Sequence, residues 1–140
     1  MLRDDQMRRY SRHLLLPELG GVAQERLLAG AVGVATLDAA GQAAVLYLAA
    51  AGVGRIVVRD ARMVDAPGPL FEAEDVGRAR RDAARVRVAA LNGDCVVVDA
   101  ADGALELQVD GAGGASVAEA FGTGAAAARR VLRQLAGVAS

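Results

Sequence analysis

The turn at residues 36–41 is the part of the sequence best placed to support nucleotide chemistry. It follows an apolar run at 31–35 and precedes an alanine-rich segment and a second apolar run that ends at Asp60. This order predicts a βαβ unit, in which nucleotide-binding proteins place glycines at the turn so that the backbone can approach phosphates. The turn reads TLDAAG, so Gly41 is its one glycine and Asp38 begins the helix. A carboxylate there favours helix capping and disfavours a bound triphosphate.

Arginine supplies all 16 basic side chains of the 140-residue chain, so lysine is absent. This excludes a phosphate-binding lysine of the Walker type, a Schiff-base lysine and a lysine general base within these residues. The single histidine, His13, has no cysteine or second histidine to form a metal site, and we expect no metal ligands. Cys95 lies in an apolar run and is expected to be a small buried hydrophobic residue.

Charge and hydropathy exclude several classes of partner. The net charge is −1, which does not favour nucleic acid or an anionic membrane surface. No run of about 20 apolar residues occurs without charge or glycine, so no membrane span is expected. The first residues are acidic, and the one cysteine cannot form an internal disulfide, so we expect a cytoplasmic protein.

Apolar periodicity and turn residues predict alternating helices and strands over residues 1–140 as a single domain, with an N-terminal helical arm at about 1–29. We expect an α/β fold: a shortened Rossmann-like three-layer sandwich with a mostly parallel sheet and the N-terminal helices packed outside. The segment 105–109 alternates apolar and polar residues, which suggests an edge strand. The glycines at 122 and 124 predict a weak point in the last helix. The helices are predicted at 4–15, 22–29, 39–51, 74–91 and 116–136, and the strands at 31–36, 55–60, 95–98 and 105–109.

Several separated segments, in order, resemble the ThiF/MoeB family, the bacterial relatives of ubiquitin-activating enzymes. The resemblance covers residues 7–98, and residues 117–137 are similar to that family's late helix. The segments that carry it are RYSRHLLLPELG at 9–20, QERL at 24–27, LYLAAAGVGRI at 46–56 and EDVGR at 74–78. The family uses Mg-ATP to adenylate the C-terminal glycine of a ubiquitin-like or sulfur-carrier protein.

The resemblance implies roles for particular residues. It places the family's ribose-binding aspartate at Asp60 and its lysine at Arg80. The arginine that is lent across a dimer falls on Arg12, and the metal-binding aspartate falls on Asp102. Of the family's Gly-x-Gly-Gly-x-Gly, this sequence keeps Gly41. The candidate site is therefore Arg12, Arg80 and Asp102 as catalytic residues, with Gly41 and Asp60 as cofactor-binding residues.

The sequence departs from the family pattern at several contacts to ATP. The second aspartate of the family's Asp-x-Asp is Arg62, and the segment that supplies an asparagine and an arginine is replaced by Pro67-Gly68-Pro69. Between residues 99 and 116 the sequence skips the portion that carries the family's nucleophilic cysteine and its zinc ligands.

Structural roles compete with each of these functional roles. Asp60 could also be a turn residue at the end of a strand, and Arg12 could be a solvated helix residue or an ion-pair partner in a dimer. The arginines near residues 78–87 are interspersed with acids and lack aromatic neighbours, which favours a solvated helix face over phosphate or nucleic-acid binding.

Two functions follow from the sequence. The first is a degenerate family member, a pseudoenzyme with no expected cofactor, that acts as a protein-interaction scaffold. It would hold a ubiquitin-like or sulfur-carrier protein, form a homodimer or pair with a full-length relative. The second is an ATP/Mg-dependent adenylyltransferase of a ubiquitin-like sulfur-carrier protein. A different nucleotide or dinucleotide in the same cleft is a third and weaker alternative.

Overall fold

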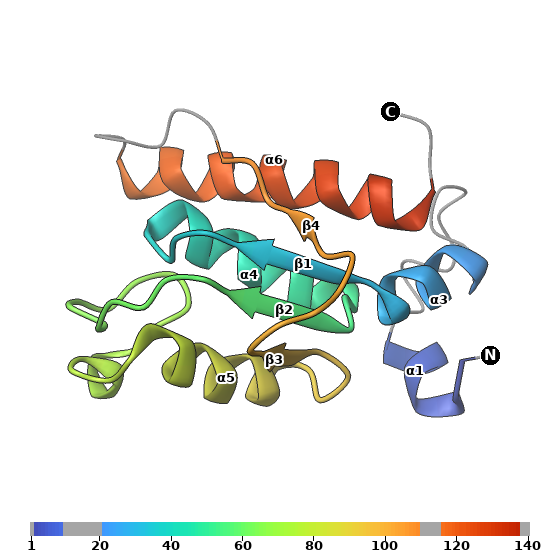
Figure 1. The fold of residues 1–140 in the computed structure, drawn as a ribbon, viewed down its shortest axis with the longest axis horizontal. Coiled ribbons are helices and arrows are strands. Elements are labelled where there is room, and N and C mark those ends of the chain that lie inside the picture. Colours follow the sequence, from blue (N-terminus) through green and yellow to red (C-terminus); the bar gives the residue numbers. More distant parts are fainter. Residues whose placement is uncertain (1, 10–20, 110–115, 138–140) are drawn as a thin grey trace.

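A computed structural model describes residues 2–9, 21–109 and 116–137 and shows an α/β domain built on one parallel sheet (Figure 1). The strand order is β3-β2-β1-β4. The strands are β1 (Ala31–Val34), β2 (Arg55–Val58), β3 (Val96–Val98) and β4 (Leu105–Glu106). The helices are α1 (Asp4–Arg9), α3 (Gly21–Ala29), α4 (Ala39–Ala51), α5 (Arg80–Leu91) and α6 (Val117–Ala136), and a 3₁₀ turn, η1, covers Ala73–Asp75.

The helices α4 and α5 link adjacent parallel strands, and right-handed crossovers place both on one face of the sheet. The helix α6 packs along α4 and shares this layer (Figure 1). The link between β3 and β4, residues 99–104, crosses the opposite face (Figure 1). Among the described residues this link, and not a helix, forms the outer layer on that side.

The core lies between the sheet and the three helices and is built from small aliphatic side chains. Alternate residues of β1 and β2, such as Val32 and Ile56, are fully buried there. Close helix packing depends on Gly124, because a Cβ atom on this residue would lie 2.0 Å from the carbonyl oxygen of Ala40. This contact brings α6 against the first turn of α4.

The predicted α/β fold with a mostly parallel sheet is confirmed, and most predicted elements occur within a few residues of their expected bounds. The helix predicted at 4–15 is seen as α1 up to Arg9, and its later residues lie outside the described ranges. The helix predicted at 74–91 is wrong at its start, because Gly77 adopts a left-handed φ of 90° and α5 begins at Arg80. The weak point predicted at 122–124 is also absent, since α6 runs through it as one helix. The edge position of residues 105–109 is confirmed for β4.

None of the described helices is both long enough and apolar enough to cross a bilayer.

Candidate functional site

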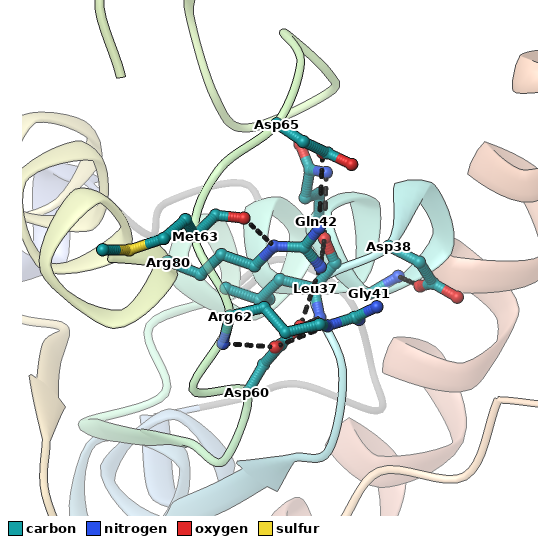
Figure 2. Close-up of polar contacts among 9 residues, drawn as sticks. All are labelled: Leu37, Asp38, Gly41, Gln42, Asp60, Arg62, Met63, Asp65 and Arg80. Atoms are coloured by element: carbon teal, nitrogen blue, oxygen red, sulfur yellow. Dashed lines mark hydrogen bonds and ion pairs between the residues drawn. The ribbon is translucent and has the colours of Figure 1, made fainter. Parts of the chain in front are cut away.

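The candidate site lies at the carboxyl ends of β1 and β2, where open α/β sheets place their ligands. A pocket of about 670 Å³ opens there. Its walls come from the turn before α4, from residues 62–69, from Arg80 at the start of α5 and from Phe121 of α6. Figure 2 shows that the side chains of Arg62 and Arg80 converge on Asp60 at the base of this region.

Asp60 is buried, with 2% of its side chain exposed, and its carboxylate accepts five hydrogen bonds. Arg62 donates three of them: its backbone N–H and its Nε to Oδ1 at 3.1 and 3.0 Å, and its Nη2 to Oδ2 at 3.0 Å. The N–H of Leu37 and the Nη1 of Arg80 each donate to Oδ2 at 2.8 Å. The protein itself therefore occupies both carboxylate oxygens.

Arg80 is nearly as buried as Asp60, with 9% of its side chain exposed. Its guanidinium also donates to the backbone carbonyls of Met63 at 3.0 Å and Leu37 at 3.3 Å, and lies 3.4 Å from Asp65. The Arg80 guanidinium therefore contacts the base of the turn, at Leu37, and residues 63–65. The resemblance predicted Arg80 as a site residue, while the neighbouring arginines were expected to form a solvated helix face. In the structure Arg80 lies inside the site, where it forms a buried ion pair with Asp60.

The hydrogen bonds determine the charge state of Asp60. Burial alone would raise the pKa of this carboxyl group. The bonds from Arg62, from the Leu37 N–H and from Arg80 outweigh burial and hold the pKa of Asp60 well below its ordinary value. Asp60 is therefore an anion whose charge is balanced by Arg62 and Arg80 at neutral pH.

The turn before α4 directs two of its backbone amides to carboxylates of the protein. The Leu37 N–H donates to Asp60, and the Gly41 N–H donates to Oδ1 of the helix N-cap Asp38 at 2.9 Å (Figure 2). In a phosphate-binding turn, backbone amides of this kind point at the ligand. Here both amides instead donate to side-chain carboxylates of the protein itself.

Gln42 holds the same turn against the proline-containing segment. Its side-chain amide donates to the carbonyl oxygen of Leu37 at 3.1 Å, and its Oε1 accepts the N–H groups of Leu70 and Phe71 at 3.1 and 3.3 Å. The buried Gln42 therefore ties the turn to residues 66–71. This connection closes the network around the carboxyl ends of β1 and β2.

Gly41 has a packing role in this geometry. A Cβ atom at this position would lie 2.0 Å from the carbonyl oxygen of Thr36. The turn therefore requires glycine for the close approach of its own backbone, whether or not a phosphate binds.

The structure brings together Gly41, Asp60 and Arg80, and it separates Asp102 from them. The link from β3 runs back to the amino end of β4, and Asp102 lies three residues before that end. No hydrogen bond or ion pair within the described ranges joins Asp102 to Asp60. Arg12 lies outside the described residues.

Sequence reasoning missed the central roles of Arg62 and Gln42. For Arg62 a signal was present, since an arginine replaced the second acid of the family's Asp-x-Asp two residues after Asp60, where it forms a bidentate pair. For Gln42 the signal was a polar residue within an otherwise apolar helix. Its partners are 28 and 29 residues away and could not be identified from spacing.

Burial, together with the nearby Asp94 carboxylate, raises the pKa of the Cys95 thiol to about 12, so this thiol is not a nucleophile at neutral pH. Within residues 2–9, 21–109 and 116–137, no cluster of three or more histidine, cysteine or acidic residues could hold a metal ion.

The sequence of this chain matches a known protein family over most of its length. The model of the ThiF family matches residues 10–114. The chain belongs to the ThiF family. Its relatives include a probable adenylyltransferase/sulfurtransferase MoeZ of Mycobacterium tuberculosis, which is 39% identical over 95 residues. A sulfur carrier protein adenylyltransferase of Thermus thermophilus is 36% identical over 92 residues.

This chain spans only about a quarter to a third of the length of these two relatives. The alignments cover 65% and 63% of this chain but 24% of the Mycobacterium protein and 34% of the Thermus protein. Among solved structures, PaaA is similar with a TM-score of 0.63 and 27% identity, covering 69% of this chain and 33% of PaaA. Escherichia coli tRNA N6-threonylcarbamoyladenosine dehydratase, TcdA, shares the fold with a TM-score of 0.61 and 22% identity, covering 71% of this chain and 43% of TcdA.

Proposed function

We propose that this chain is a ThiF-family scaffold that has lost triphosphate binding and acts through protein interactions. The observation that carries the proposal is the pairing of turn amides with internal carboxylates: Leu37 with Asp60, and Gly41 with Asp38. A triphosphate would have to displace Asp38 from its helix cap. It would also have to approach the buried carboxylate of Asp60 without two of the amides that normally compensate phosphate charge.

The cations of the site support the same proposal. Arg62 and Arg80 both direct donors at Asp60, and the remaining bonds of the Arg80 guanidinium go to the carbonyls of Met63 and Leu37 and to Asp65. Recruiting either arginine to a phosphate would leave the buried carboxylate with fewer partners. The residues present therefore do not fit Mg-ATP, and no adenylation step is derived through them.

Isothermal titration calorimetry with Mg-ATP tests the loss of nucleotide binding. We expect no heat of binding in the micromolar range and no ATP–pyrophosphate exchange, whereas the Thermus sulfur carrier protein adenylyltransferase serves as the positive control. Micromolar affinity for Mg-ATP or measurable exchange by this chain would contradict the proposal.

A second candidate function is adenylation of a sulfur-carrier protein, and the identity to relatives named as adenylyltransferases favours it. Asp60 is retained, and Arg80 supplies a cation at the position of the family lysine. In this case a second copy or a full-length relative would have to complete the phosphate site. AMP formation with a carrier protein that ends in Gly-Gly would support this candidate, and unchanged AMP formation by Asp60→Ala would count against it.

The scaffold proposal implies a protein partner. The expected partners are a ubiquitin-like or sulfur-carrier protein, a second copy of the chain, or a full-length relative. Analytical ultracentrifugation of the chain alone, and then of its mixture with each candidate, measures which assembly forms. A chain that remains monomeric in every mixture would leave the scaffold without its expected partner and contradict that part of the proposal.

A further inference from the structure

The open edge of the sheet at β4 is a second surface with binding potential. The strand β4 pairs with β1 on one side and ends the sheet on the other. The Leu107 N–H donates to the carbonyl oxygen of Gly33 at 2.8 Å, so the backbone groups of Leu107 face β1. Successive residues of a strand alternate in the direction of these groups, and the N–H and C=O of Glu106 and Gln108 therefore face the open edge.

A groove lies along this edge, lined by Glu106 and Gln108 on one side and by residues of the second half of α6 on the other. It has a volume of about 320 Å³. Arg130 lies on the α6 side, where its Nη2 donates to the carbonyl oxygen of Gln108 at 3.1 Å. This bond confirms that the backbone of Gln108 is directed outward.

The groove has a positive rim. Arg129 and Arg130 are exposed and, with Arg133, line an adjoining pocket of about 250 Å³. The acid of the groove, Glu106, forms a two-point ion pair with Arg59, with the second contact at 2.9 Å. The negative charge of Glu106 is thus already balanced from within the sheet, and the arginines of α6 determine the sign of the groove.

We propose that an extended acidic segment of a partner protein adds to the β4 edge, with its backbone paired to Glu106 and to the N–H of Gln108 and its carboxylates on Arg129 and Arg130. The carbonyl oxygen of Gln108 keeps its bond from Arg130, whose other guanidinium N–H groups face the partner. Strand addition of this kind combines main-chain hydrogen bonds with side-chain selection. The proposal rests on the scaffold role proposed above and gives the chemistry of its partner. The groove shares no lining residue with the pocket at Asp60, so the two sites can be tested separately.

Fluorescence anisotropy with a labelled peptide of about eight alternating valine and glutamate residues tests the proposal. At about 50 mM salt we expect saturable binding of this peptide and no binding of its valine–lysine counterpart. The double variant Arg129→Glu/Arg130→Glu should weaken binding at least about tenfold. The control Arg8→Glu, at an exposed arginine of α1, should bind like the unmodified chain.

Strand addition is separated from charge attraction by two further probes. Gln108→Pro removes one outward N–H and should weaken binding about fivefold. Two N-methylated peptides provide the second probe, one methylated on the odd residues and one on the even residues. Only the peptide whose methyl groups replace the N–H groups that face β4 should bind weakly. Equal binding by both N-methylated peptides, or by the Arg129→Glu/Arg130→Glu variant, would overturn the proposal. A chain that dimerises and becomes monomeric with Gln108→Pro would show that a second copy occupies this edge, which would also overturn it.

Failure of this proposal differs from failure of the scaffold proposal. Heat from Mg-ATP binding would contradict the proposed loss of nucleotide binding, whether or not the acidic peptide binds. Absence of peptide binding in a chain that also ignores Mg-ATP contradicts only the assignment of the β4 edge.

Discussion

Replacement of Asp60 by asparagine should destabilise the fold, because this carboxylate is the anion around which the site is assembled. The substitution keeps the shape of the side chain and removes its charge. Arg80, with 9% of its side chain exposed, would then lose its buried counterion. Removal of one partner of a buried ion pair costs about 3–5 kcal/mol.

The expected loss lies at the lower end of that range. Arg62 has 60% of its side chain exposed, so water can rehydrate it and its share of the cost is small. Arg80 also keeps its bonds to the carbonyls of Met63 and Leu37. We therefore expect Asp60→Asn to lower the free energy of unfolding by about 3 kcal/mol, out of the roughly 5–15 kcal/mol typical of a domain.

Urea unfolding followed by far-ultraviolet circular dichroism measures this loss, since the chain has no tryptophan to report it by fluorescence. The matched control is Asp65→Asn, because Asp65 also lies beside Arg80 but is 85% exposed. The control should change the free energy of unfolding by less than about 1 kcal/mol. An Asp60→Asn variant as stable as the unmodified chain, or a control with an equal loss, would refute the reasoning.

Gly124→Ala should lower the melting temperature because its Cβ would meet a backbone carbonyl, whereas Gly122→Ala, with open space in the same helix, should raise it slightly; equal shifts in thermal denaturation would contradict this. The pKa of Asp60 is lowered by folding, so its contribution is complete above pH about 4 and declines as the pH falls. The free energy of unfolding should therefore drop more steeply below pH about 4 in the unmodified chain than in Asp60→Asn, and parallel pH profiles would argue against this linkage. Cys95, 1% exposed and with a pKa of about 12, should react with a thiol-specific dye at about pH 8 only after unfolding in urea; comparable labelling of the native chain would show that the thiol is accessible.

The local features of the site could be predicted from the sequence. The bounds of α4 follow from Asp38, a strong N-cap, and from Gly52, which adopts the left-handed conformation at the C-cap. The position of Asp60 near the carboxyl end of β2 follows from the apolar run before it. These inferences succeeded because hydrophobic periodicity and capping act over a few residues.

The partners of Asp60 required the tertiary structure. The donors on its carboxylate come from residues 37, 62 and 80, which the sheet and α5 bring together across 23 and 20 residues of sequence. Residue types alone left Arg80 as either a ligand-binding cation or part of a solvated face. Its burial decided that it is an internal counterion, since a charge removed from water requires a partner of opposite sign.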